Sequence, residues 1–354
     1  MKTGVARISL VYILISVAKF LAFLESKVFD VLVKIALVVL IGYALVLNRL
    51  HIERFYSQVG SDAKTIIWYK TLPANYFTKL DQESKVALIK YQESLKPQPP
   101  KKIAEVAFPA ISAKSYIILD RASNTVLSSS QANVAFPPAS TAKIATSLAT
   151  LKIYKLDEEI TVPQFCTQVD GVKAGILQGQ KFLVGDLLKA LLVYSAGDAG
   201  CTLSIGKTSY ADFIVLMNQV AKENNLQNTK FTNPIGLDDA DGENLASAED
   251  LATLGVVATQ NDFIKEVVKL KEFQLNSVDG KYSKTLASTN KLLTDIPESV
   301  GIKTGTTTGA GEVLIYEYAK DKMDIIIVVM GSKDRFADTS DILGWTLKSY
   351  AWNK

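Results

Sequence analysis

The sequence predicts an α+β fold, because strand-like segments lie near both ends of its globular part and helix-like segments lie between them. Two such segments follow one another at 115–120 (SYIILD) and 125–130 (TVLSSS), and a second pair lies at 312–319 and 324–332. Short polar turns join the members of each pair, which is a hairpin signal. We therefore expect a sheet that brings the two ends of the globular part together.

Helical periodicity is found between the strand pairs and at the C-terminal end of the chain. We expect helices at Ser140–Tyr154, Val184–Val193, Ser247–Thr259 and Asp338–Tyr350. In the first of these, apolar residues recur at 144, 148 and 151, which is the spacing of one helix face. The last segment is amphipathic. These helices would supply the layer that covers the sheet.

The N-terminal 47 residues are the most apolar part of the chain. Ile8–Leu24 is interrupted only by Lys19, and Val31–Leu47 only by Lys34. A membrane-spanning helix needs about 20 apolar residues, and no small-residue cleavage site follows. We expect residues 1–47 to be a retained membrane anchor, either one transmembrane helix or a hairpin; two buried core helices are the alternative.

The charges around this anchor predict its orientation. If only the second apolar segment spans, the basic residues before it stay inside and the globular part is exported, as the positive-inside tendency favours. If both segments span, export requires that the N-terminus also lies outside. We expect a protein of the cell membrane with an extracytoplasmic globular domain. The basic residues are Lys2, Arg7, Lys19, Lys27 and Lys34.

A polar segment separates the anchor from the globular part. It carries an amphipathic helical pattern around Thr78–Leu95 and ends in LKPQPPKK, whose prolines stop a helix and favour extended backbone. We expect 48–107 to be a stalk or linker and 108–354 to be one domain.

Composition excludes several classes of function. The formal net charge of +3 and the scattered basic residues give no nucleic-acid footprint. His51 is the only histidine, which argues against a Ser-His-Asp triad and a His-based zinc site. Cys166 and Cys201 are too few for a Cys-only zinc site; they could pair outside the cytoplasm or remain two buried thiols. We therefore expect no metal and no cofactor.

The stretch PPASTAKIAT at 137–146 places a serine three residues before a lysine at the start of a predicted helix. Residues three apart share a helix face, so the amine of Lys143 would lie beside the hydroxyl of Ser140. The alternative is an ordinary N-cap serine. A lysine acts as a base only if burial or a second cation lowers its pKa. A Ser–Lys mechanism therefore predicts another cation nearby.

Two further segments fit such a mechanism. Lys303, Thr304 and Gly305 lie in GIKTGTTTGAG ahead of a predicted strand, where an amine, hydroxyls and a closely approaching backbone suit a carboxylate ligand. Ser195 follows an apolar run in LLVYSAGDAG. Each short motif is weak alone; their order along the chain is informative.

With PASTAK, Ser195-Ala196-Gly197 and Lys303-Thr304-Gly305, residues 108–354 resemble the serine D-alanyl-D-alanine carboxypeptidases, low-molecular-mass penicillin-binding proteins. The resemblance implies the transpeptidase-like fold shared with β-lactamases, an antiparallel sheet flanked by helices with a helical lobe that carries Ser195. Other stretches similar to the family are FTNPIGLDD, ASAEDLATL and TGTTTGAG.

The resemblance also implies roles. Ser140 would attack the D-Ala–D-Ala carbonyl, Lys143 would take its proton, and Ser195 would relay a proton to the leaving amine. The resemblance assigns substrate binding to Lys303, Thr304, Gly305 and Thr306, with the Ser140 and Thr306 N–H groups as the oxyanion hole. The expected partners are peptidoglycan stem peptides, β-lactam inhibitors and the membrane.

One residue departs from the family pattern. Gly197 stands where the S-x-N motif has asparagine, so an amide that would contact substrate and Lys143 is missing. A catalytically weakened or inactive penicillin-binding protein is therefore an alternative to the carboxypeptidase. A β-lactamase is a weaker one, because it needs a carboxylate-bearing loop to drive deacylation, and no convincing E-x-x-x-N arrangement of that kind lies between Ser195 and Lys303. Carboxypeptidase and endopeptidase action are not distinguished.

Overall fold

The computed structural model describes Val86, residues 97–238 and residues 244–352. The chain divides into two compact units, Met1–Tyr91 and Gln92–Lys354, and the elements from β1 onward belong to the second. The predicted anchor and nearly all of the predicted stalk helix lie outside the described residues. Among the helices that the structure describes, none is both long and apolar enough to cross a membrane.

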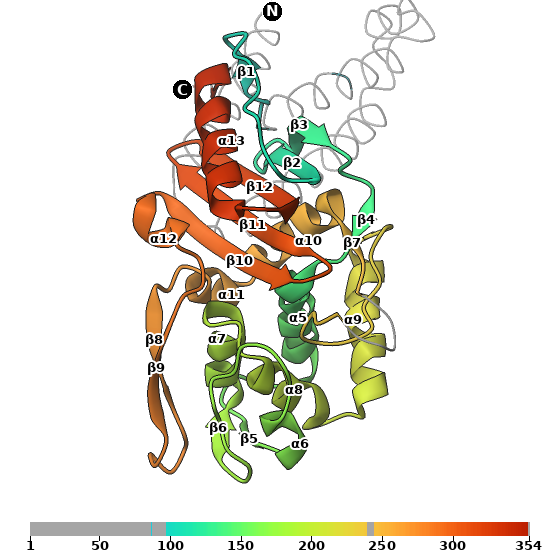
Figure 1. Ribbon diagram of the computed structural model, residues 1–354, viewed down its shortest axis with the longest axis vertical. Helices are drawn as coiled ribbons and strands as arrows, with labels where there is room; N and C mark the ends of the chain where they lie inside the picture. Colours follow the sequence, from blue (N-terminus) through green and yellow to red (C-terminus); the bar gives the residue numbers. More distant parts are fainter. Residues whose placement is uncertain (1–85, 87–96, 239–243, 353–354) are drawn as a thin grey trace, which may run out of the picture. The chain divides into compact units, whose positions relative to one another are not determined.

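A five-stranded antiparallel sheet forms one part of the second unit (Figure 1). Its order places the N-terminal hairpin beside the C-terminal one, because β12 pairs with β2. The α+β class and both hairpins are confirmed. In spatial order the strands are β10 (Ser299–Thr307), β11 (Gly311–Lys320), β12 (Met323–Ser332), β2 (Ser115–Asp120) and β3 (Thr125–Ser130).

Helices cover both faces of this sheet, which explains why its central strand is a continuous apolar run rather than an alternating one. α10 (Ala248–Gln260) packs against one face and α13 (Arg335–Ser349) against the other. Successive side chains of a strand point to opposite faces. Accordingly, alternate β12 residues join two separate cores: Ile326, Val328 and Met330 in one, and Ile325, Ile327 and Val329 in the other.

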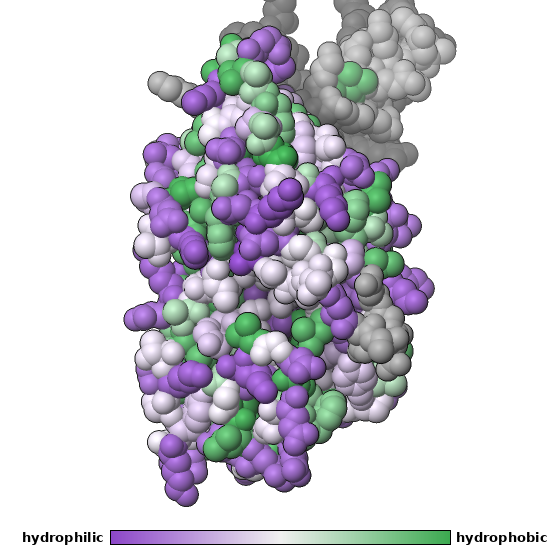
Figure 2. Space-filling view, viewed as in Figure 1, coloured by the Kyte–Doolittle hydropathy of each residue, from purple (hydrophilic) through white to green (hydrophobic). Residues whose placement is uncertain are grey.

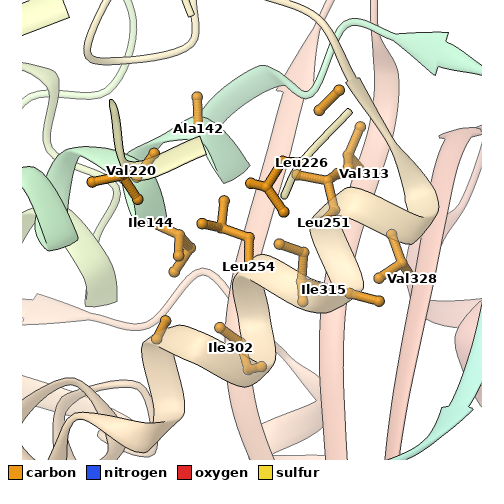
Figure 3. Close-up of a cluster of buried hydrophobic side chains, with 14 of the residues drawn as sticks. Ala142, Ile144, Val220, Leu226, Leu251, Leu254, Ile302, Val313, Ile315 and Val328 are labelled. Atoms are coloured by element: carbon orange, nitrogen blue, oxygen red, sulfur yellow. The ribbon is translucent and has the colours of Figure 1, made fainter. Parts of the chain in front are cut away.

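The core between α10 and the sheet also holds the helix that follows Ser140. That helix is η1 (Ala139–Ala142) continuing into α5 (Lys143–Ile153). Figure 3 shows Ile144 pointing toward Leu254, with Ile315 and Val328 close by. All four side chains are fully buried. Truncation of a leucine or isoleucine among them to alanine would lower the free energy of unfolding by about 2–5 kcal/mol. The start of α5 is thus fixed by the main core.

A lobe of helices with a core of its own lies on the other side of α5 (Figure 1). The β8–β9 hairpin extends along it. Fully buried Phe182, Leu187 and Leu203 belong to this second core. The lobe contains α6 (Gln164–Thr167), α7 (Val184–Val193), α8 (Gly197–Ile205) and the hairpins β5–β6 (Glu159–Thr161, Lys181–Leu183) and β8–β9 (Glu272–Asn276, Ser283–Ala287). α9 (Tyr210–Glu223) packs against α5, and its buried side chains belong to the main core.

The folded body extends further toward the N-terminus than the expected boundary at residue 108. β1 (Lys101–Lys102) pairs with β13 (Tyr350–Ala351), and the Trp345 indole donates to the carbonyl of Val106 at 2.9 Å. Residues 101–107, which the sequence assigned to the stalk, therefore pack with the C-terminal end. Residues 97–100, in the proline-rich segment before them, belong to no helix or strand.

A disulfide joins Cys166 in α6 to Cys201 in α8, with their Cα atoms 5.3 Å apart. The sequence had left this pairing open. Closing a loop across 35 positions is worth about 4 kcal/mol in the chain-entropy model. Hydrophilic side chains cover much of the face seen in Figure 2, with apolar ones scattered among them.

Candidate active site

Ser140 lies in the 3₁₀ turn at the start of α5, and its side chain does not cap the helix. Neither η1 nor α5 has a side-chain hydrogen bond at its N-cap, and the residues in those positions are Pro138 and Ala142. Instead, Lys143 Nζ donates to Ser140 Oγ at 2.8 Å. The N-cap alternative for Ser140 is therefore wrong, and the two side chains meet as the i, i+3 spacing predicted.

The side-chain amine of Lys143 is enclosed by protein. The residue is 3% exposed, and burial lowers the pKa of its amine from the usual value to about 7. Its second partner is a backbone carbonyl, that of Ile235, at 2.5 Å. Among the residues that the structure describes, no carboxylate pairs with it. The amine is thus half deprotonated near neutrality.

Two glycines fix the segment that carries Ser140. A Cβ on Gly236 would lie 1.9 Å from the carbonyl oxygen of Ala139, and the positive φ of +74° also favours glycine there. A Cβ on Gly305 would lie 2.9 Å from the backbone nitrogen of Ser140. The backbone therefore approaches Ser140 from two sides at distances that no other residue type permits.

The segment that presents the Ile235 carbonyl explains the FTNPIGL stretch. The Asn233 side chain accepts hydrogen bonds from three backbone N–H groups in the turn, those of residues 235, 236 and 237. Asn244 holds the preceding backbone, and Thr146 on α5 donates to the carbonyl of Pro234. A carbonyl acceptor for Lys143 could not be predicted from side-chain types.

Ser195 lies in the tight connection between α7 and α8. Its φ is +66°, which is unusual for a non-glycine residue and common where a structure holds strain at a functional site. The residue is 6% exposed. No described residue is hydrogen-bonded to its hydroxyl, so a proton relay through Ser195 stays a prediction. Ala139, just before Ser140, also has a positive φ, of 49°.

Lys303 and Thr304 lie within β10, the edge strand beside η1. The strand that the sequence predicted after them is β11, but the sequence did not predict that they lie in a strand themselves. Lys303 is 1% exposed, and burial lowers the pKa of its amine well below the usual value, with Lys143 and Arg335 adding repulsion. Its Nζ donates to the Thr304 carbonyl at 3.1 Å. Lys303 is therefore a second amine near Lys143, whereas burial is what lowers the pKa of Lys143 itself.

Arg335 is a third cation at the site, and sequence reasoning missed it. Its guanidinium donates to the Gly305 carbonyl at 3.0 Å and to the Thr306 hydroxyl. Glu312 accepts from its backbone N–H and lies 3.8 Å from its guanidinium. Arg335 is the first residue of α13, directly after the N-cap Asp334, so the sequence here indicates only a helix start.

Gly197 begins α8, and a loop of the helical lobe lies against it. Its N–H donates to the carbonyl of Val172 at 2.7 Å. A Cβ at this position would lie 3.4 Å from that oxygen, an ordinary contact. The neighbouring Asp198 is fully buried, and its carboxylate accepts from the backbone N–H groups of 174, 175 and 176. Asp198 therefore holds this loop and does not replace the missing amide.

The sheet, the helical lobe and the buried Ser–Lys pair between them define the class of penicillin-binding and DD-peptidase folds. Residues 102–334 match the family described as D-alanyl-D-alanine carboxypeptidase, and the chain belongs to that family, as its three motifs predicted. Among the described residues, no group of three or more His, Cys, Asp or Glu side chains could hold a metal ion.

Similar proteins differ in the reaction that their names describe. The chain is 32% identical to the D-alanyl-D-alanine carboxypeptidase DacC of Escherichia coli over 69% of its own length, and 28% identical to the D-alanyl-D-alanine endopeptidase of that organism over 67%. The Streptomyces K15 DD-transpeptidase structure superposes with a TM-score of 0.65 at 26% identity and covers 68% of this chain and 98% of that one. The chain spans 64% of DacC and 78% of the endopeptidase.

Proposed function

We propose that the protein is an exported, membrane-anchored serine carboxypeptidase that removes the terminal D-Ala from peptidoglycan stem peptides. The observation that carries this proposal is the 2.8 Å contact between Ser140 Oγ and the buried Nζ of Lys143. A neutral amine at that distance is within reach of the hydroxyl proton. The pKa of about 7 makes such an amine available at neutral pH.

In the first half-reaction, Ser140 Oγ forms a bond to the carbonyl carbon of the D-Ala–D-Ala bond as its proton passes to Lys143. The C–N bond then breaks, and the leaving amine receives that proton through the Ser195 hydroxyl. The product is an ester on Ser140. Water attacks this ester in the second half-reaction. One of its protons restores the Ser140 hydroxyl, and the shortened peptide leaves as a carboxylic acid that ionises to the carboxylate.

One set of backbone N–H groups and one set of polar and cationic side chains would assist this reaction. The N–H groups of Ser140 and Thr306 would bind the developing oxyanion, a contribution of about 3–4 kcal/mol per donor in a well-studied hydrolase. Lys303, Thr304 and Arg335 would attract the C-terminal carboxylate of the substrate. Burial and the neighbouring cations disfavour the charged form of Lys303, and a bound carboxylate would favour it again.

Export is supported by two independent features. The disulfide between Cys166 and Cys201 favours an oxidising compartment, where peptidoglycan also lies. The apolar segments within residues 1–47 have the length and charge pattern of an anchor. Protease added outside intact cells with a permeable outer layer should release a fragment that begins after Leu47. Full protection of the domain would contradict export and, with it, this function.

Covalent labelling tests the assignment of Ser140. A fluorescent penicillin should label the purified domain, and Ser140→Ala should abolish the label. Ser204→Ala is the matched control, because Ser204 has the same spacing to Lys207 but its hydroxyl donates to the carbonyl of Cys201. Labelling that persists in Ser140→Ala would overturn the assignment.

A penicillin-binding protein without turnover is the second candidate, because Gly197 lacks the amide of the S-x-N motif. A lost hydrogen bond to a charged partner costs about 1.5–3 kcal/mol, or roughly 10- to 200-fold in rate. We expect slow but measurable D-alanine release from a D-Ala–D-Ala pentapeptide and faster release by Gly197→Asn, whose Cβ the loop accommodates. If wild type releases no more than Ser140→Ala while still binding penicillin, the second candidate is correct.

A further inference from the structure

Thr289 contacts both the segment before Ser195 and strand β10, although no motif marks it. It lies between β9 (Ser283–Ala287) and α12 (Leu292–Asp295). Its backbone N–H donates to the carbonyl of Val193 at 3.2 Å, two residues before Ser195. Its hydroxyl oxygen lies 2.5 Å from the hydroxyl oxygen of Thr304. One residue thus connects the Ser195 turn with the Lys303-Thr304-Gly305 strand.

The backbone around Thr289 is held in place on both sides. The N–H of Ser288 donates to the carbonyl of Lys271 at 2.7 Å, and the N–H of Asn290 donates to the Ser288 hydroxyl at 3.2 Å. Asn290 is 6% exposed. The Thr289 hydroxyl therefore meets Thr304 from a fixed position, which is the condition for a preorganised polar contact.

The two hydroxyls share one hydrogen bond, and its direction has a chemical consequence. Each hydroxyl has a single hydrogen to donate. If Thr304 donates to Thr289, its hydrogen is used and it offers an anion nothing. If Thr289 donates to Thr304, the Thr304 hydrogen is free to point at a ligand. Only the second arrangement suits a carboxylate, which accepts hydrogen bonds and donates none.

We propose that Thr289 is a positioning residue for the carboxylate subsite: its hydroxyl donates to Thr304 and turns the Thr304 hydrogen toward the C-terminal carboxylate of the substrate. This inference rests on the proposed function. It adds a residue that contributes to the preference for substrates with a carboxylate over neutral analogues. Lys303 and Arg335 contribute charge to the same subsite, but neither sets the orientation of a hydroxyl hydrogen.

The test compares benzylpenicillin with its methyl ester, which carries the same lactam and no carboxylate. Acylation rates of the intact chain in detergent are followed by mass spectrometry for wild type, Thr289→Val and Thr289→Ser. Wild type should prefer the acid. Thr289→Val, which removes the hydroxyl at nearly constant volume, should lose about 3- to 10-fold with the acid and change less than about twofold with the ester. Thr289→Ser should retain the wild-type preference.

A double-mutant cycle separates orientation from general damage. In a Thr304→Val background, replacing Thr289 by valine should leave the acid-to-ester ratio unchanged, since no hydrogen remains to be oriented. Equal losses with acid and ester in Thr289→Val would reveal a merely structural role and overturn the inference. If Thr289→Val fails to fold, Thr289→Ala against Thr289→Ser gives the same comparison. Failure of wild type to be acylated at all would instead contradict the proposed function.

Discussion

Two groups of buried charged side chains lie in this domain, one in the cleft and one on the sheet, and they differ in how their charges are balanced. In the cleft, Lys143 and Lys303 have no carboxylate partner among the described residues, and the guanidinium of Arg335 lies 3.8 Å from Glu312. On the sheet, Arg121 lies 2.8 Å from Glu317 and 3.6 Å from Asp324.

The group on the sheet is a small network with its own counterion. Glu317 on β11 and Asp324 on β12 are diagonal neighbours, since Glu317 pairs with Ile326. Burial raises the pKa of both carboxyls, and Arg121 opposes both shifts. The charge of Asp324 raises the pKa of Glu317 further, whereas Glu317 lowers the pKa of Asp324 by hydrogen bonding. One arginine faces two carboxyls, so this group can reach neutrality by holding one proton.

The cleft group has no comparable way to become neutral except by releasing protons from its amines. That difference is informative, because a structural charge network is balanced within the protein, whereas a binding site leaves its balance to the ligand. A substrate carboxylate would supply the missing charge. We infer that the unbalanced cations around Ser140 lower the stability of the fold and serve substrate binding and catalysis. The predictions below test whether the two groups differ in this way.

The largest effect is expected for Lys143→Met, which replaces the buried amine by an apolar chain of similar length. Loss of the general base should slow penicillin acylation by about 10²–10⁴-fold. The same change should raise stability by about 1–4 kcal/mol at pH 6, because the lowered pKa means that the folded state disfavours the protonated amine. This gain should shrink as pH rises toward 9. Acylation kinetics measure the loss of rate, and thermal denaturation at pH 6 and pH 9 measures the change in stability. A Lys143→Met variant that is less stable than wild type at pH 6 would contradict the prediction.

The opposite result is expected for the sheet network. Arg121→Met should leave acylation unchanged within about twofold and destabilise the domain by about 2–4 kcal/mol at pH 7, because the buried carboxyl of Glu317 and the partly exposed carboxyl of Asp324 lose their cation. Chemical denaturation measures the loss. Lys348→Met, which removes a cation from the surface of α13, is the control and should cost little. An acylation defect in Arg121→Met would mean that the two groups are coupled.

The smallest effect is a pH dependence. A carboxyl whose pKa is raised on folding stabilises the fold below its unfolded pKa and loses that contribution as pH rises through the folded value. Glu317→Gln removes this titration. Relative to wild type, Glu317→Gln should therefore gain melting temperature as pH rises from 4.5 to 8. A constant difference across that range would show that Glu317 does not titrate abnormally.

The sequence predicted the sheet hairpins well because their patterns are local. SYIILD and TVLSSS became β2 and β3 at the predicted residues, since apolar strands joined by a polar turn have few alternatives. The strand around Lys303 was not recognised: its Gly- and Thr-rich sequence has weak strand propensity, and pairing with β11 stabilises it. α9 had also gone unpredicted, although Ser209 caps it.

In the candidate site, too, local contacts could be predicted from the sequence and tertiary contacts could not. The Ser140–Lys143 contact follows from spacing on one helical turn, so the sequence was sufficient. The Ile235 carbonyl, the Arg335 guanidinium and the pairing of Cys166 with Cys201 all depend on tertiary proximity. No pattern within a single element encodes such contacts, and a backbone acceptor has no residue type to recognise.

The claim that most depends on this structure is that Lys143 is a neutral base near pH 7. It is tested most directly by the second-order rate of penicillin acylation between pH 5 and 9, corrected for spontaneous hydrolysis at each pH. The neutral fraction of an amine increases as pH rises through its pKa, so the rate should rise with a midpoint near the pKa of about 7. A rate that is flat over this range, or that still rises about tenfold per pH unit at pH 9, as expected for the ordinary lysine pKa of about 10.4, would contradict the assignment of Lys143 as the base.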